Sequence, residues 1–156
     1  MFNIVLVQPE IPPNTGNVIR LAANTGCALH LIEPLGFAME DRLLRRAGLD
    51  YHEYARVQRH AGWEAFVQRC APDPQRRFAF TTRASRRFDT VDWRAGDWLV
   101  FGSETAGLAS ALREQFAPEQ LLRLPMRPGQ RSLNLSNAVA VAVFEAWRCC
   151  AYAGGG

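Results

Sequence analysis

Residues 98–108 read WLVFGSETAGL, and this stretch decides the fold class. Trp98 to Phe101 is a short apolar run typical of a central strand, and Gly102 turns the chain directly after it. A helix is expected from Leu108 to about Phe116. A strand that passes through a glycine turn into a helix is the repeating unit of α/β proteins with a parallel sheet.

The same alternation continues on both sides of this stretch. Further strands are expected at Phe2–Val7, Ala28–Ile32, Arg77–Thr81 and Leu121–Leu124, and further helices at residues 14–24 (with Asn14 or Thr15 as the cap), 40–47, 63–69 and 134–147. The sequence therefore predicts an α/β fold with a mostly parallel sheet that helices cover on both faces. A chain of 156 residues is enough for one core, so we expect residues 1–152 to form a single domain and residues 153–156 a flexible tail.

Composition narrows the classes of protein. No stretch approaches the roughly 20 apolar residues that a membrane span needs, and residues 1–7 lack the basic start of a secretory signal. The cysteines are Cys27, Cys70, Cys149 and Cys150, and none of them forms a C-x-x-C pair. We therefore expect reduced thiols in the cytoplasm, with Cys27 in the core, no structural zinc site and no bound metal.

The basic residues of the chain are all of one type, and they are clustered in the sequence. All 18 basic residues are Arg, the net charge is +3 and the pI is about 8.9. A coding bias explains the missing lysines, but it does not explain why the arginines gather at residues 42–46, 83–87 and 127–131. Clustered cations favour a polyphosphate partner such as RNA, although a solvated charged surface is the alternative.

The expected last helix, residues 134–147, is apolar on nearly every side. Its apolar side chains include Val139, Val141, Val143 and Phe144. A helix that is apolar all round is buried all round, which in so small a domain indicates a homodimer interface. The alternative is a central helix in a monomeric core.

Parallel sheets bind ligands beyond the carboxyl ends of their strands, which here means the loops after Val7, Thr81, Phe101 and Leu124. The first of these loops reads PEIPPNTGN at residues 9–17. Free N–H groups around Asn14 and Gly16 favour an anion such as an RNA phosphate. Asn17, Arg20 and Asn24 share one helical stripe. An ordinary amphipathic helix is the alternative interpretation.

Two other loops have the composition of a binding site. Gly102 allows a ligand close to the backbone, and Glu104 can accept from a hydroxyl or an amine. Neither a Walker loop nor a G-x-G-x-x-G fingerprint is present, and a purely structural turn remains the alternative. In residues 124–137, LPMRPGQRSLNLSN, the side chains of Ser132, Asn134 and Ser136 can hold a ligand without adding charge.

Together the three segments resemble the motifs of the SpoU branch of the SPOUT class of RNA 2′-O-methyltransferases. These motifs are N-x(5)-R at residues 14–20, F-G-S-E-x-x-G-L at 101–108 and P-M-x(5)-S-L-N-L-S at 125–136. All three occur in order, which is far more specific than any one of them. Nearly the whole chain, including PEIPPNTGN, IRLAANTG, RRAGLDYHEY and NLSNAVAVAVFEAWR, is similar to the single-domain enzymes that modify the tRNA wobble nucleotide.

The resemblance implies a deep C-terminal trefoil knot, a fold that general topology rules would reject. It also implies a homodimer through the last helix that completes each RNA site. The cofactor would be S-adenosylmethionine, and the substrate the ribose of cytidine or carboxymethylaminomethyl-uridine at position 34 of tRNA, with leucine tRNAs expected. The cofactor-binding residues implied are Phe80, Thr81, Gly102, Glu104, Leu124, Met126, Ser132 and Asn134.

The family analogy assigns activation of the ribose hydroxyl to Arg20, with Asn14 and Ser132 as the other catalytic residues. A guanidinium is not an ordinary base, so we interpret Arg20 as an anchor for the ribose and its phosphate. His30, His52 and His60 are poorer candidates for a base, and His30 is expected in a strand. The RNA-binding residues implied are Asn17, Arg20, Arg46, His52, Arg127 and Arg131.

Three departures from the family pattern leave the fixed residues of the three motifs unchanged. Ala106 stands where relatives carry Arg, Phe144 where Tyr is expected, and Phe80 where Leu is expected. We expect them to bear on RNA affinity or choice of RNA rather than on the reaction class. The competing interpretations are a ribosomal-RNA methyltransferase, a nucleotide-binding module of flavodoxin or Rossmann type, and an RNA-binding protein without catalysis.

Overall fold

A seven-stranded sheet forms the centre of the computed structural model, which describes residues 1–46, 48–54 and 56–156. Every strand pairing in the described residues is parallel. The spatial order of the strands is β3-β2-β1-β6-β4-β7-β5. Their bounds are β1 Asn3–Val7, β2 Ala28–Ile32, β3 Val57–His60, β4 Arg77–Phe80, β5 Arg86–Arg87, β6 Trp98–Phe101 and β7 Leu121–Arg123.

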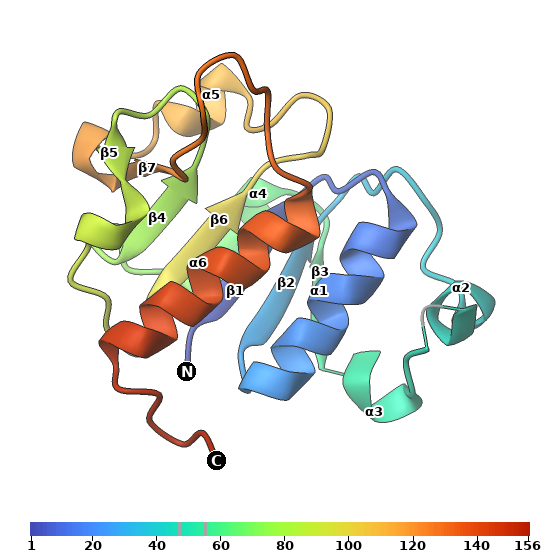
Figure 1. Ribbon diagram of the computed structural model, residues 1–156. Coiled ribbons are helices and arrows are strands. Elements are labelled where there is room, and N and C mark those ends of the chain that lie inside the picture. Colours follow the sequence, from blue (N-terminus) through green and yellow to red (C-terminus); the bar gives the residue numbers. More distant parts are fainter. Residues whose placement is uncertain (47, 55) are drawn as a thin grey trace.

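Helices cover both faces of this sheet. Two long helices, α1 (Pro12–Thr25) and α6 (Leu135–Cys149), lie side by side on one face, and α4 (Trp63–Cys70) lies behind the other (Figure 1). The shorter elements are α2 Asp41–Arg46, α3 Tyr51–Tyr54, α5 Ser110–Arg113 and the 3-10 turns η1 Phe88–Thr90 and η2 Pro118–Gln120. Within the described part of the chain, no helix has the length and apolar content that crossing a bilayer requires.

Each strand divides its side chains between two apolar cores. In β1, Ile4 and Leu6 pack with Val18 of α1 and Val139 of α6. Val5 and Val7 point the other way and pack with Phe66 of α4. Side chains alternate across a strand, so a sheet with helices on both faces needs apolar residues at every position. This explains the unbroken apolar runs in the sequence.

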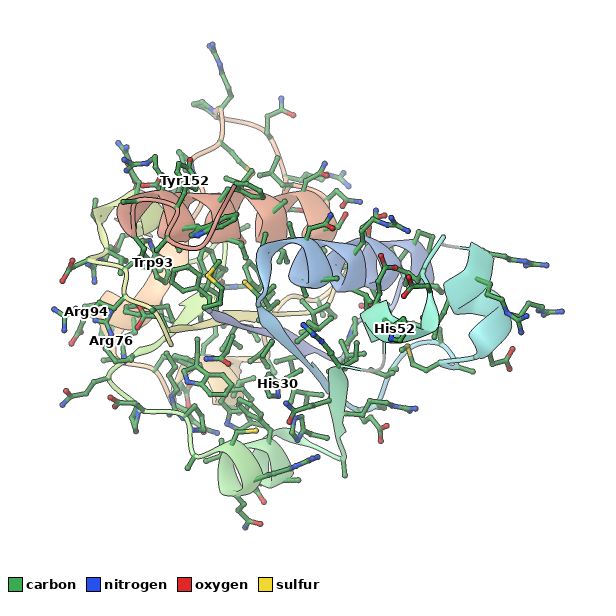
Figure 2. All side chains as sticks on the ribbon, turned by 90° about the horizontal axis from the view of Figure 1, so that it is seen from below. His30, His52, Arg76, Trp93, Arg94 and Tyr152 are labelled. Carbon is green, nitrogen blue, oxygen red and sulfur yellow. The ribbon has the colours of Figure 1, made fainter. Side chains whose placement is uncertain are left out.

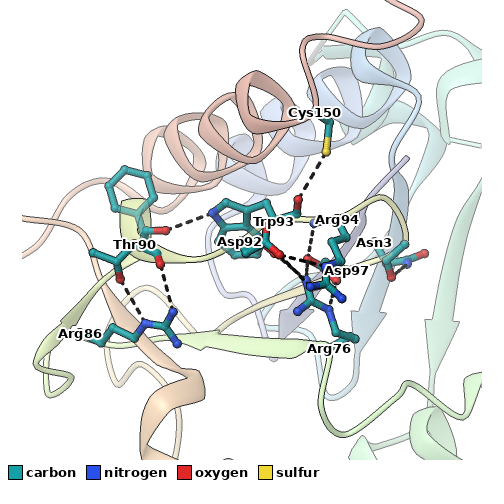
Figure 3. Close-up of polar contacts among 11 residues, drawn as sticks. Asn3, Arg76, Arg86, Thr90, Asp92, Trp93, Arg94, Asp97 and Cys150 are labelled. Atoms are coloured by element: carbon teal, nitrogen blue, oxygen red, sulfur yellow. Dashed lines mark hydrogen bonds and ion pairs between the residues drawn. The ribbon is translucent and has the colours of Figure 1, made fainter.

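The segment 81–97 joins β4 to β6 and contains β5 and η1, and a buried carboxylate fixes its end (Figure 3). Asp97 is only 1% exposed, and it accepts from Arg76 Nε at 2.7 Å, from Arg76 Nη2 at 2.6 Å and from the Arg94 backbone N–H at 2.8 Å. Trp93 donates its indole N–H to the Phe88 carbonyl at 3.1 Å. A buried charge needs such partners, and here they hold the start of β6 beside the start of β4.

The predicted strands are confirmed to within about one residue, and His30 does lie in a strand. The predicted cap of the first helix is wrong, because Ile11 is the N-cap and Pro12 and Pro13 occupy the first turn, where proline is favoured. The helix expected at residues 108–116 is shorter, spanning Ser110–Arg113. The helix expected to reach Ala47 ends at Arg46, and Ala47 lies outside the described residues.

Helix α6 differs from the prediction in a way that matters for assembly. Val139 and Val143 are fully buried against the chain's own sheet, whereas Val141 is 46% and Phe144 44% exposed. The helix is therefore not buried all round within one chain. Its exposed stripe, defined as Asn137, Val141, Phe144 and Arg148, is the part that a partner could cover.

Candidate active site

A cavity of about 420 Å³ opens at the carboxyl edge of the sheet. Its walls come from the loops after β1, β4, β6 and β7 and from the start of α6, which include the four loops singled out in the sequence. Such a volume lies in the usual range for sites that hold small molecules and cofactors. Its lining includes all eight residues expected to bind a cofactor, namely Phe80, Thr81, Gly102, Glu104, Leu124, Met126, Ser132 and Asn134.

The floor of the cavity is aromatic and apolar. Phe80 stacks on Phe101 with ring centroids 4.6 Å apart, and Leu124 and Met126 line the cavity beside them. Ser132 and Asn134 also line the cavity. The charged residues Arg83, Glu104 and Arg113 also belong to the lining, so the cavity combines apolar surface with polar and charged groups and suits a ligand that has both an aromatic and a polar part.

The structure needs a glycine at position 102 for a different reason from the one that the sequence suggests. A Cβ atom at this position would lie 2.2 Å from the Gly107 carbonyl carbon and 2.3 Å from the Leu108 nitrogen. The loop 103–107 therefore folds back onto Gly102, with Gly107 in the left-handed region at φ 66°. Glycine here allows backbone to meet backbone, and a larger residue would disrupt the loop before any ligand arrived.

Two acidic side chains hold the β1 and β6 loops together beside the cavity. Glu104 accepts from the Glu10 backbone N–H at 2.9 Å and from the Ile11 backbone N–H at 2.5 Å. In return, Glu10 accepts from the Thr105 hydroxyl at 2.9 Å and from the Thr105 backbone N–H at 3.2 Å. These bonds, with the Thr105 hydroxyl first, lower the pKa of the Glu10 carboxyl. The Glu104 carboxylate is thus occupied by backbone, and it orders the first loop.

Asn134 joins the third motif to the first. Its Oδ1 atom accepts from the Ser136 N–H at 3.0 Å and so caps α6. Its amide donates to Asn14 Oδ1 at 2.9 Å, and Asn14 is only 4% exposed. This bond fixes the amide of Asn14 with its oxygen toward Asn134, and it leaves the Asn14 N–H donors for a ligand.

Arg20 lies apart from the other two expected catalytic residues. Asn14 and Ser132 line the cavity, but Arg20 is absent from the described lining of that cavity. Its guanidinium donates to the Gly48 carbonyl and lies 3.8 Å from Glu53, with 46% of the side chain exposed. Arg20 lies six positions after Asn14, or roughly 9 Å along the axis of α1.

The expected RNA-binding residues lie in three exposed places. Asn17 is on α1 beside α6, where it donates to Ser136 Oγ at 3.4 Å. Arg46 ends α2, and His52 lies on α3 near α1 (Figure 2). Arg127 and Arg131 belong to the exposed loop that leads from β7 to the cavity wall. The structure brings none of these side chains into the cavity lining that it describes.

Sequence reasoning missed two kinds of residue at this site. Glu10 lies in the loop after the first strand, which the sequence marks as part of a candidate site. An acidic side chain in such a loop is the signal from which its role could have been predicted. Arg113 lines the cavity and donates to the Leu108 carbonyl at 2.6 Å, but in sequence it is one arginine among many. Its place depends on the shortened α5 and could not be predicted.

Similar proteins share this fold and nearly the whole sequence. A curated tRNA (cytidine(34)-2'-O)-methyltransferase from Burkholderia pseudomallei is 68% identical over 155 residues, which cover 99% of each chain. A solved structure described as giving insights into the 2-OH methylation of C/U34 on tRNA is 42% identical, with a TM-score of 0.87 and 97% of each chain covered. An AdoMet-bound rRNA methyltransferase from Sinorhizobium meliloti is 27% identical with a TM-score of 0.79, covering 94% of this chain and 56% of that one.

The family model reaches across both halves of the site. It matches residues 1–144, which include the β1 loop, the β6 loop and most of α6. The chain belongs to the SpoU rRNA methylase family.

Proposed function

We propose that this protein methylates the ribose 2′-hydroxyl of nucleotide 34 in tRNA, with S-adenosylmethionine as the methyl donor. The observation that carries the proposal is the cavity in which the three family motifs meet. Asn14 of the first, Gly102 and Glu104 of the second and Asn134 of the third all line it. S-adenosylmethionine supplies a methyl group on a positively charged sulfur, and the protein's share of the work is to position and to bind.

The residues present fit this cofactor. Phe80, Leu124 and Met126 offer apolar surface for an adenine ring and for the carbon chain of the methionine part, while Ser132 and Thr81 offer hydroxyls for its polar ends. Asn14 presents an N–H donor to the same space, where it can orient the ribose hydroxyl. Fixing a reacting group in line with its partner supplies a large share of the rate in a transfer of this kind.

The share of each relative that the chain covers favours a tRNA substrate over ribosomal RNA. The chain covers 99% of the curated enzyme named for cytidine 34 of tRNA but 56% of the solved rRNA methyltransferase. Exposed arginines on α2 and on the loop after β7 provide cations for RNA phosphates. Cytidine or carboxymethylaminomethyl-uridine at position 34 of leucine tRNAs is the substrate we propose, in the cytoplasm.

A second copy of the chain completes the proposed site. Arg20 lies outside its own chain's described cavity lining, on the exposed side of α1. Helix α1 runs beside α6, whose stripe exposes Val141 and Phe144 (Figure 1). Pairing two chains through α6 would bury these apolar side chains and bring Arg20 toward the partner's cavity. There it anchors ribose and phosphate rather than acting as a base. We further propose one knotted domain over residues 1–152, with residues 153–156 as its tail.

The proposal is tested by incubating the purified protein with methyl-labelled S-adenosylmethionine and total tRNA from cells that lack this modification. Ribosomal RNA in a parallel reaction is the competing substrate. We expect label in tRNA and only background in rRNA. Label in rRNA alone would make the protein a ribosomal-RNA methyltransferase, and cofactor binding without transfer to either RNA would remove the enzymatic assignment.

A further inference from the structure

A second group of reactive side chains lies on the far side of the sheet from α1 and α6. It consists of His30 in β2, His60 at the end of β3 and Cys70 at the end of α4. Figure 2 shows His30 between the sheet and α4, away from the two long helices. His30 is 2% and His60 3% exposed, and Cys70 is half-buried. None of these residues lines the described cavity, so the methyl-transfer site makes no use of them.

The fold itself brings these three residues together. Strands β2 and β3 are parallel neighbours in which Ile32 pairs with His60, and His30 lies two residues earlier on the same face. The chain then forms α4, which returns across this face and ends at Cys70. His30 Nδ1 lies 3.0 Å from His60 Nε2 and 3.8 Å from Cys70 Sγ. All three ligand atoms lie within 4.8 Å of one another.

We propose that His30, His60 and Cys70 bind one thiophilic transition-metal ion of the Zn²⁺ type. Zinc binds imidazole nitrogen at about 2.0–2.1 Å and thiolate sulfur at about 2.3 Å, so ligand atoms of a tetrahedral site lie roughly 3.4–3.6 Å apart. The observed separations bracket these values, and small side-chain rotations are enough to close the site. Three protein ligands leave a fourth position for water or another small ligand.

Burial lowers the pKa of one side chain of the cluster and raises that of another. Burial, with His60 and Arg69 adding to it, lowers the pKa of His30 to about 4, so this imidazole is neutral and able to ligate at neutral pH. The same burial has the opposite effect on Cys70, because it raises the pKa of the thiol. Metal binding must therefore release the thiol proton. The resulting thiolate offsets one of the two charges of the ion. Arg69 opposes the remaining charge and favours the thiolate.

Aromatic rings enclose the two imidazoles. The Phe66 ring centroid lies 5.6 Å from that of His30 and 5.2 Å from that of His60, and the Trp98 ring lies 5.2 Å from His30. His30 Nδ1 lies within hydrogen-bonding distance of both His60 Nε2 and Cys70 Sγ, so three polar atoms share one apolar enclosure, and one bound ion would satisfy them together. The ion would tie α4 to the edge of the sheet formed by β2 and β3.

The site is tested with cobalt as a spectroscopic substitute for zinc. The full-length protein, freed of metal by dialysis against a chelator, is titrated with Co²⁺. We expect one equivalent per chain to bind with a thiolate-to-cobalt charge-transfer band, and Zn²⁺ to remove that band. Cys70→Ser should abolish the band, and His60→Gln should weaken Co²⁺ binding at least tenfold. The matched control Cys149→Ser removes an exposed thiol and should leave the titration unchanged.

Two further measurements separate binding from loss of fold. Both ligand variants should keep wild-type methyl transfer within about twofold, since the cluster lies across the sheet from the cavity, and near-ultraviolet circular dichroism should report intact packing. Zn²⁺ should raise the Tm of the wild type but not that of Cys70→Ser, because a ligand that binds the folded state stabilises it. The proposal is overturned if the wild type gives no charge-transfer band, or if the band survives in Cys70→Ser. Either result leaves an ordinary hydrogen-bonded histidine pair.

Discussion

Asn134 and Asn14 are 120 residues apart in sequence, and the Nδ2 atom of Asn134 donates to the Oδ1 atom of Asn14 at 2.9 Å. The same Asn134 side chain caps α6 through its oxygen. One residue therefore fixes both the start of the last helix and the direction in which Asn14 faces the cavity.

Asn134→Asp separates these two tasks. Aspartate is as good an N-cap as asparagine, so the free energy of unfolding should change little. The new carboxylate cannot donate, so the Asn14 amide must turn over and present its oxygen to the cavity. We expect kcat/KM for methyl transfer to fall about tenfold or more, since a mispaired buried polar group costs on the order of 1–3 kcal/mol. Unchanged turnover in a folded variant would remove the Asn14 N–H from the mechanism.

The hydrogen bonds from Thr105 to the Glu10 carboxylate predict that the stability of the fold depends on pH. The folded state lowers the pKa of Glu10 below its ordinary value of 4.5, chiefly through the Thr105 hydroxyl. The stabilisation is therefore complete above pH 4.5 and is lost as the pH falls through the lower pKa of the folded state. In Thr105→Val, urea unfolding should show a smaller loss of stability below pH 4.5 than in the wild type. Identical pH profiles for the two proteins would show that the hydrogen bonds between Thr105 and Glu10 do not contribute to the free energy of unfolding.

The burial pattern of α6 predicts which substitutions dissociate the dimer and which unfold the single chain. Phe144→Glu and Val141→Arg place charge on the exposed stripe and should give a folded monomer in sedimentation. Val143→Arg places charge in the chain's own core and should unfold it, so that variant says nothing about assembly. Gln68→Arg, on the exposed side of α4, is the matched control and should remain a dimer. A wild type that is monomeric at micromolar concentration would contradict the shared site.

Much of the site could be predicted because its parts are local in sequence. Glycine turns and small polar residues after apolar runs mark the loops that line the cavity. Strand β3 was missed because Val57–His60 reads VQRH, an edge strand with a single aliphatic residue. The orientation of α6 could not be predicted either, because Val139 and Val141 are equally apolar and tertiary packing decides which of them is buried. The position of Arg20 outside the cavity likewise depends on its contacts with residues 48–53.

Arg20 predicts that chemistry and cofactor binding are separable. Arg20→Ala should lose roughly a hundredfold in methyl transfer, the scale seen when a preorganised donor is removed, with cofactor affinity nearly intact by calorimetry. Arg20→Lys should restore little, because lysine lacks the planar fork that can hold phosphate and ribose together. A parallel loss of cofactor binding would make Arg20 a structural residue.

Mixing two inactive variants shows whether the site is shared. Arg20→Ala chains and Ser132→Ala chains, unfolded and refolded together, form heterodimers in which one of the two sites has both residues intact. Random pairing should restore about a quarter of wild-type activity. No recovery, with heterodimers verified by mass, would place both residues in a site made by one chain.

The central claim is that the methyl group reaches the ribose of nucleotide 34. A 2′-O-methyl group removes the hydroxyl that attacks the neighbouring phosphodiester, so that bond resists alkaline cleavage. Unmodified leucine tRNA treated with the protein and S-adenosylmethionine, then with alkali, should show one new protected bond, on the 3′ side of nucleotide 34. Label on a base, or protection at any other nucleotide with position 34 still cleaved, would contradict the account.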